Sequence, residues 1–170
     1  KRFRGGMYLT VAWPVIGYFR QNEYADVIIT DYDGIPLDID GEGSGFDLAR
    51  KRIQSHGSQG MCIVESSPGK PITNDDWKPA TPHELPPVSG GIIPIINRGT
   101  RGQFYWTCPH CNEPFRPRFE TLKWEDKGTP GEMAKTVAMV CTNNGCIIGP
   151  DRKNELNAAG FYLHETNDGQ

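Results

Sequence analysis

Continuous apolar runs and a helical repeat alternate in the amino-terminal part of the chain. Residues 25–30 and 61–66 are short apolar runs, which are typical of strands buried in a parallel sheet. Between them, residues 46–56 carry apolar side chains at helical spacing. Ser44, followed three positions later by Asp47, predicts the N-cap of this helix. Strand, helix and strand in this order, joined by short connections, predict a βαβ unit and an α/β fold with a parallel sheet.

Outside the βαβ unit, the pattern predicts a strand over residues 6–13, which Pro14 ends, and a short helix over residues 15–22. Residues 69–100 are rich in proline and show little periodicity, so they are typical of a linker or an extended arm. Strand character resumes at residues 103–108. These changes divide the chain into three predicted parts: an α/β part at residues 1–68, a proline-rich linker or arm at residues 69–100, and a second module with a C-terminal helix at residues 101–170.

Composition restricts the class of protein. With 36% hydrophobic and 23% charged residues, the 170-residue chain suits a soluble globular protein. The net charge of -3 means that any contact with nucleic acid has to use a local basic patch. No apolar stretch approaches the roughly 20 residues of a membrane span, and no signal peptide is recognised. The chain opens with Lys1 rather than Met, which favours a part of a longer protein.

Four of the five cysteines form two close pairs. Two residues separate Cys108 from Cys111, and the second pair, Cys141 and Cys146, follows after a long insert. Two thiol pairs on tight turns are what a tetrahedral zinc ion requires, and four thiolates leave no open position for catalysis at the metal. In a module this small, metal binding would supply much of the folding energy. A redox CxxC motif and unpaired thiols are the alternatives, and His110 is a competing ligand.

Basic and aromatic side chains are interleaved around the cysteine pairs. This mixture on a small β module is a pattern of nucleic-acid binding. An ordinary exposed basic rim around an aromatic core explains it equally well. The candidate nucleic-acid contacts are Arg98, Arg101, Arg116 and Arg118, among Phe104, Tyr105, Trp106 and Phe115.

Two carboxylates follow the apolar run at residues 25–30. Asp31 and Asp33 come directly after it, and Gly34 makes the second one part of a strong turn dipeptide. A turn is one explanation. The other is a magnesium site at the carboxyl end of a parallel strand, where α/β sheets bind ligands.

Several short motifs now stand in one order, and together they resemble the large subunit of phage DNA-packaging terminases, in the lambda-type branch. The resemblance extends from about residue 3 to residue 146. Its parts are Phe3-Arg4-Gly5-Gly6, the strand VIIT that ends in Asp31, the turn DGEGS at residues 40–44, the strand CIVE that ends in Ser66-Ser67-Pro68, and NRGTRGQFYWTCPHC at residues 97–111 before the second cysteine pair.

The resemblance implies a role for several positions. Asp31 matches the Walker B aspartate, which holds the Mg2+ of bound ATP through water, and the next position in the family is a water-activating Glu. This chain has Tyr32 there, although Asp33 is a candidate substitute. Ser66 and Ser67 match the motif that couples nucleotide state to DNA movement. The cysteines match a structural zinc ribbon between the motor and the nuclease. The implied fold is therefore part of a P-loop-type ATPase core with a parallel βαβ sheet, followed by a small β-rich zinc ribbon.

The family places the P-loop upstream of the matched region, and this chain contains no G-x-x-x-x-G-K-[ST] motif. The resemblance thus implies the second half of a motor ATPase, with double-stranded DNA, the terminase small subunit and the portal as partners in the host cytoplasm. We expect the chain alone to be inactive as an ATPase. Two alternatives remain, namely a non-enzymatic zinc-ribbon module that binds nucleic acid or protein, and a degenerate prophage remnant.

Overall fold

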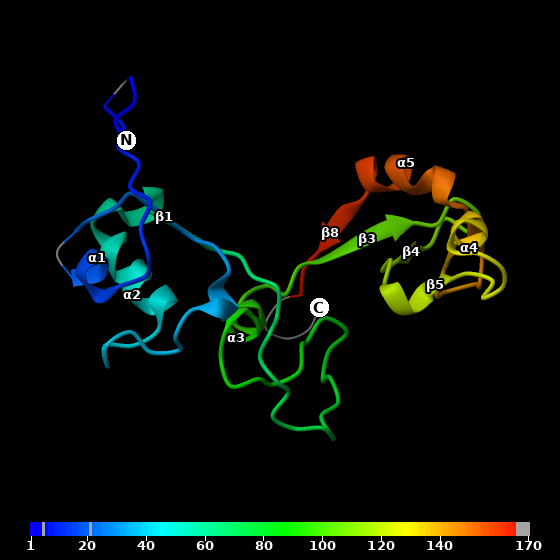
Figure 1. Cartoon of the computed structure of the whole chain (residues 1–170), viewed down its shortest axis with the longest axis horizontal. Helices are drawn as coiled ribbons and strands as arrows, with labels where there is room; N and C mark the ends of the chain where they lie inside the picture. Colours follow the sequence, from blue (N-terminus) through cyan, green and yellow to red (C-terminus); the bar gives the residue numbers. More distant parts are fainter. Residues whose placement is uncertain (5, 21, 166–170) are drawn as a thin grey trace. The chain divides into compact units, whose positions relative to one another are not determined.

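The computed structural model describes residues 1–4, 6–20 and 22–165 and divides the chain into two compact units (Figure 1). The first unit contains residues 1–79 and 85–99, and the second contains residues 80–84 and 100–170. Gly5 of the predicted Phe3–Gly6 motif and the last five residues of the predicted second module lie outside the described residues.

A two-stranded parallel sheet organises the first unit. Strand β1 (Asp26–Ile29) pairs with β2 (Met61–Val64) in the register Asp26 to Met61 and Ile29 to Val64. Helix α2 (Gly45–Arg52) connects them, so the predicted βαβ unit is confirmed. Ser44 is its N-cap, because the Ser44 hydroxyl accepts a hydrogen bond from the Asp47 N–H at 3.1 Å. A mixed helix and strand fold with a parallel pair therefore agrees with the α/β prediction at this level.

Helix α2 packs on one face of the sheet. The helix α1 (Ile16–Arg20) lies in the segment where a short helix was predicted. Apolar side chains from these elements and from the loop after β1 form one core, which removes them from water and stabilises the unit. Its buried members are Phe19, Ile29, Tyr32, Ile39, Leu48 and Ala49.

The predicted strand over residues 6–13 is wrong. Only Tyr8 in this segment makes a bridge, with Arg2, and the remaining positions have no strand partner among the described residues. Val11 and Trp13 are 88% and 84% exposed. An apolar run has the side chains of a strand, but a strand also needs a hydrogen-bonded neighbour, which local sequence cannot supply.

The proline-rich segment is mostly part of the first unit. Ile72 and Val88 form an antiparallel bridge, and the N–H of Thr73 donates to the Pro87 carbonyl at 2.9 Å. Helix α3 (Ile92–Arg98) follows, although the sequence pattern predicted no element there. Its first turn contributes the buried side chains of Ile92 and Ile93, so burial rather than helical periodicity accounts for this short helix.

The second unit consists of small antiparallel sheets around the cysteines. One sheet has the strand order β4-β3-β8 and the other has β5-β6-β7. The core contains Cys108 and Cys141 together with the aromatic rings of Trp106 and Phe115, which meet edge to face. The strands are β3 (Gln103–Thr107), β4 (Pro114–Phe115), β5 (Leu122–Lys123), β6 (Ala138–Val140), β7 (Ile147–Ile148) and β8 (Phe161–Leu163), and the helices are α4 (Pro130–Thr136) and α5 (Lys153–Ala158).

Candidate functional site: strand ends, cysteine cluster and arginines

The carboxyl ends of β1 and β2 are tied together directly after the strands. Asp31 adopts a left-handed backbone conformation, with φ of 53° and ψ of 46°, and begins a short 3-10 turn over Tyr32–Gly34. The Asp31 N–H donates to the Glu65 carboxylate at 3.2 Å, and the Tyr32 N–H donates to the Glu65 carbonyl at 3.1 Å. The register of the parallel pair thus places Asp31 next to the residue that ends β2.

Asp33 joins three segments through its own hydrogen bonds. Its carboxylate accepts the N–H of Ile92 at 2.7 Å on one oxygen and the N–H of Gly69 at 2.8 Å on the other. Its backbone N–H donates to the Ser66 hydroxyl at 2.8 Å. A Cβ added at Gly91 would lie 2.5 Å from this carboxylate, so the absence of a side chain at that position makes room for Asp33.

These bonds also set the acidity of Asp33. Partial burial acts to raise the pKa of the carboxyl group, because it disfavours the charged form. The amide hydrogen bonds from Gly69 and Ile92, with smaller contributions from Ser66 and Lys70, outweigh this effect and hold the pKa below its ordinary value. Asp33 is therefore an ionised structural anchor whose two oxygens are both occupied.

Asp31 and Tyr32 face opposite environments. The Asp31 side chain is exposed, and its carboxylate makes no hydrogen bond or ion pair with the residues that the structure describes. Tyr32 is 7% exposed, belongs to the core, and accepts the Phe46 N–H with its hydroxyl at 3.4 Å. Tyr32 is thus packed inside the unit rather than exposed at the strand ends.

Sequence reasoning missed Glu65. It is exposed at the end of β2, and one of its oxygens accepts the Asp31 N–H. The signal was present in the strand that ends CIVE, because the carboxyl ends of adjacent parallel strands meet at the same edge of a sheet. Of the two serines for which a coupling role was predicted, Ser66 accepts a hydrogen bond from the Asp33 N–H and donates to the Ser67 carbonyl, while the side chain of Ser67 is exposed.

Three of the four paired cysteines converge in the second unit, and Cys141 lies beside one of them. The sulfurs of Cys108, Cys111 and Cys146 lie within 4.8 Å of one another, and the sulfurs of Cys111 and Cys141 are 3.9 Å apart. Each pair is carried by a tight turn. The Asn112 N–H donates to the Cys108 carbonyl at 2.9 Å, and a matching bond at 2.9 Å closes the second turn at the Cys141 carbonyl.

Hydrogen bonds to sulfur and burial give these thiols different pKa values. The Asn144 side chain and the Glu113 N–H bond the sulfur of Cys111 and lower its pKa to about 7. Burial raises the pKa of Cys141, although N–H groups of its own turn act in the opposite direction. Burial and the neighbouring thiols raise the pKa of Cys146 to about 11. Three converging thiols with Cys141 beside them, and with turn amides aimed at sulfur, fit a thiolate-bound metal.

The competing ligand His110 and the fifth cysteine, Cys62, lie outside this cluster. His110 is exposed and is not among the side chains that converge within the described residues. Cys62 belongs to β2 in the first unit, where partial burial raises the pKa of its thiol. The four paired cysteines are therefore the donors that the geometry brings together.

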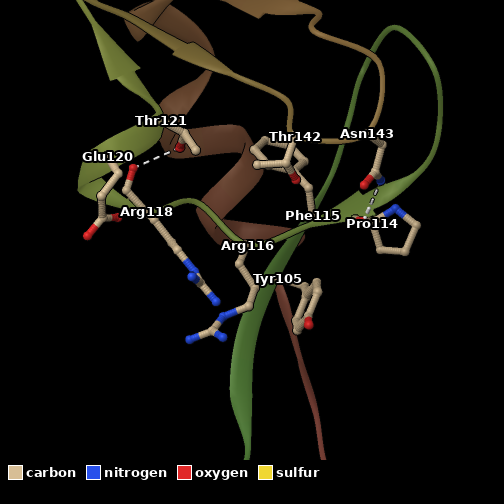
Figure 2. A pocket seen from close by; sticks show the side chains of 9 residues that line it. All are labelled: Tyr105, Pro114, Phe115, Arg116, Arg118, Glu120, Thr121, Thr142 and Asn143. Carbon is tan, nitrogen blue, oxygen red and sulfur yellow. Dashed lines mark hydrogen bonds between the residues drawn. The ribbon is translucent and has the colours of Figure 1, made fainter. Parts of the chain in front are cut away.

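The four candidate arginines have different environments. Arg98 ends α3 in the first unit and lies 6.0 Å from the Phe46 ring. Arg101 forms an ion pair with Glu165 at 3.2 Å, and only 12% of its side chain is exposed. Arg116 and Arg118 follow β4, and Figure 2 shows their guanidinium groups close together on the same side of a pocket. The structure thus groups only two of the four.

Residues 80–84 form a clip that packs within the second unit. Both oxygens of Glu165 hold it, since one accepts the Thr81 hydroxyl at 2.6 Å and the other accepts the His83 N–H at 2.9 Å. The buried His83 ring also bonds the Tyr105 hydroxyl at 2.8 Å through Nε2. Burial acts to raise the pKa of Glu165, but hydrogen bonds from Thr81 and His83 and nearby positive charge lower it overall.

Comparison with known protein families identifies the family of this chain. A sequence model described as "Phage terminase large subunit gpA, ATPase domain" matches residues 1–161, which include the strand ends and both cysteine pairs. No curated protein and no solved structure matches the chain. Among the helices that the structure describes, none has the length and apolar character needed to span a membrane.

Proposed function

The chain belongs to the family of the phage terminase large subunit gpA, in its ATPase domain, and from this we propose that it is part of a motor subunit that couples ATP hydrolysis to DNA packaging. The match over residues 1–161 is the observation that carries this proposal. The partners that follow from it are double-stranded DNA, a terminase small subunit and a portal. The family implies ATP and Mg2+ as ligands.

Asp31 is the residue that we assign to the magnesium side of the nucleotide. Its carboxylate is exposed and makes no hydrogen bond or ion pair with the described residues. It lies at the carboxyl end of a parallel strand, where α/β sheets bind ligands, and a hard cation prefers oxygen ligands of this kind. Magnesium supplies charge neutralisation of the phosphates when it is bound. The left-handed backbone of Asp31, held by the Glu65 carboxylate, directs this side chain away from the core.

The other two acids have separate roles in this proposal. Asp33 positions the segments that contain Gly69 and Ile92, because each of its oxygens accepts a hydrogen bond from one of these N–H groups. Glu65 keeps one oxygen without a bond to the described residues, and it lies beside Asp31. We therefore assign to Glu65 the orientation of the attacking water, for which the buried Tyr32 is unsuited. We assign to Ser66 the coupling of nucleotide state to DNA movement, and its hydrogen bond with the Asp33 N–H supports this assignment.

The cysteine cluster completes the proposed architecture as a structural zinc site. Cys108, Cys111, Cys141 and Cys146 would occupy all four positions of a tetrahedral ion. Two of these cysteines are part of the small core of the second unit, so metal binding and folding of this unit are coupled.

The test is steady-state phosphate release with Mg2+, ATP and linear duplex DNA, from a motor subunit that contains this chain together with a P-loop segment. Asp31→Asn should lower turnover by about 100-fold or more, because this carboxylate would help to hold the Mg2+ that neutralises the charge on the phosphates. Asp26→Asn is the matched control, since Asp26 is an exposed carboxylate at the opposite end of the same strand. Glu65→Gln should lower turnover by about 10²-fold or more with little change in the KM for ATP.

Two results would contradict the proposal. Turnover that is equal in the Asp31→Asn and Asp26→Asn variants would remove Asp31 from the nucleotide site. Turnover by the 170-residue chain alone, lost in Asp31→Ala, would mean that these residues contain a complete nucleotide site without a P-loop.

A further inference from the structure

A pocket of about 420 Å³ lies in the second unit beside the cysteine cluster (Figure 2). Two arginines extend along one side of it, and the Tyr105 ring lies next to Arg116. The opposite wall contains Thr142 and Asn143, which belong to the second cysteine turn. The pocket is therefore built from residues in and next to the strands and from the second cysteine turn.

The two guanidinium groups are held in different ways. Arg116 is half-buried, donates to the Gln103 side chain, and reaches the Pro82 carbonyl at 3.4 Å. Arg118 is exposed, and its guanidinium makes no hydrogen bond or ion pair with the residues that the structure describes. One guanidinium is thus fixed in direction before any ligand arrives, while the other has all of its donors available.

Bringing two positive groups together has an electrostatic cost. Burial lowers the pKa of Arg116, and the charge of Arg118 lowers it further. Glu120 also lines the pocket and offsets only one of the two positive charges. An anion that binds both guanidinium groups would relieve this repulsion, and the planar fork of arginine matches the oxygens of phosphate.

The second cysteine turn keeps the far wall in place. The Asn143 side chain donates to the Pro114 carbonyl at 2.9 Å and so joins this turn to β4, which follows the first cysteine turn. Formation of the pocket is therefore linked to the geometry of the cysteine cluster. The Thr142 side chain is exposed at the pocket and offers a hydroxyl donor in addition to the two arginines.

We propose that Arg116 and Arg118 form a binding site for a single phosphodiester group of the nucleic-acid backbone. This inference rests on the proposed function, in which DNA is the partner. It narrows the four candidate arginines to two, because Arg101 is engaged with Glu165 and Arg98 lies in the other unit. The site contacts the phosphate backbone and no base, so its contribution to binding affinity does not depend on the sequence of the nucleic acid.

The experiment measures binding of the metal-loaded chain to a fluorescent duplex and to a single-stranded oligonucleotide by anisotropy, over a series of salt concentrations. Arg118→Ala should weaken duplex binding by about tenfold and reduce the salt slope by about 0.9, because one phosphate is no longer neutralised by the protein. Arg118→Lys should recover part of the affinity, because it keeps the charge but not the fork. Glu120→Gln should strengthen binding, since it removes the opposing charge from the pocket.

Lys153→Ala is the control, because it removes the same charge from an exposed position on α5 in the same unit. Equal decreases in affinity for Arg118→Ala and Lys153→Ala would overturn the site in favour of bulk charge. Binding unchanged in Arg118→Ala would overturn it outright. A decrease in affinity for the single-stranded oligonucleotide alone would show that the site binds a phosphodiester of unpaired nucleic acid. That result would contradict double-stranded DNA as the partner.

Failure of this inference and failure of the proposed function are distinguishable. The expected fall in turnover for Asp31→Asn, with duplex binding insensitive to Arg118→Ala, would refute the phosphate site alone. An Arg118-dependent duplex affinity, with turnover insensitive to Asp31→Asn, would keep the phosphate site and refute the assignment of the nucleotide site.

Discussion

Replacement of Asp33 by Asn should separate its anchoring role from that of Asp31. The wild-type carboxylate accepts two amide hydrogen bonds, from Ile92 at 2.7 Å and from Gly69 at 2.8 Å. An Asn side chain of the same shape retains one acceptor oxygen. Its NH2 group then faces the second backbone N–H, so one bond is broken and one amide is left without its partner.

The expected cost follows from these hydrogen bonds. A hydrogen bond to a charged group contributes about 1.5–3 kcal/mol, and the surviving bond is no longer assisted by charge. Asp33 is half-buried, which places the effect toward the lower end of this range. We expect the free energy of local opening to fall by about 2 kcal/mol, which corresponds to about 30-fold faster amide exchange at Ile92 and Gly69.

The assay is amide hydrogen exchange of these two residues, and Asp31→Asn is the control. Asn tolerates the left-handed conformation of position 31, and the Asp31 carboxylate has no bond to lose among the described residues. The control should therefore change stability by less than about 0.5 kcal/mol. Equal exchange rates at Ile92 in the two variants would refute the anchoring role of Asp33.

The same carboxylate predicts a dependence on pH. The pKa of Asp33 is lowered in the folded chain, so its contribution to stability is complete above the unfolded value of about 3.9. It is lost as the pH falls through the lower folded value. The stability difference between wild type and Asp33→Asn should therefore be constant from neutral pH down to about 5 and should shrink in stronger acid.

Three further changes test other parts of the structure. Cys111→Ser should lower the zinc content from about one ion per chain and unfold the second unit, whereas Cys62→Ser should retain the ion by elemental analysis. Gly91→Ala should cost about 2 kcal/mol or more in urea unfolding, because φ is 78° and the new Cβ would lie 2.5 Å from a carboxylate; a neutral effect would contradict this packing. Glu165→Gln should accelerate amide exchange in residues 80–84, and unchanged rates would mean that the clip is held otherwise.

Sequence alone determined the features that depend on residues close together in the chain. The N-cap at Ser44 and the helix after it follow from a side chain that reaches an N–H three positions on. The two cysteine turns follow from short spacings, and these turns bring the sulfurs of Cys108, Cys111 and Cys146 together. The strands at residues 26–29 and 61–64 follow from apolar runs bounded by turn residues, and the family resemblance rested on these same local motifs.

Tertiary structure decided the features that depend on which distant segments become neighbours. Asp31 and Asp33 are the same type of residue. The Asp31 side chain is exposed, whereas the Asp33 carboxylate is hydrogen-bonded to Ile92, 59 residues further along the chain. Glu65 became a candidate only when the parallel register set it beside Asp31, and the apolar run at residues 6–13 failed as a strand because it has no paired neighbour among the described residues. Hydrogen bonds and burial between remote residues depend on the packed fold, whereas propensity and spacing act within a few residues.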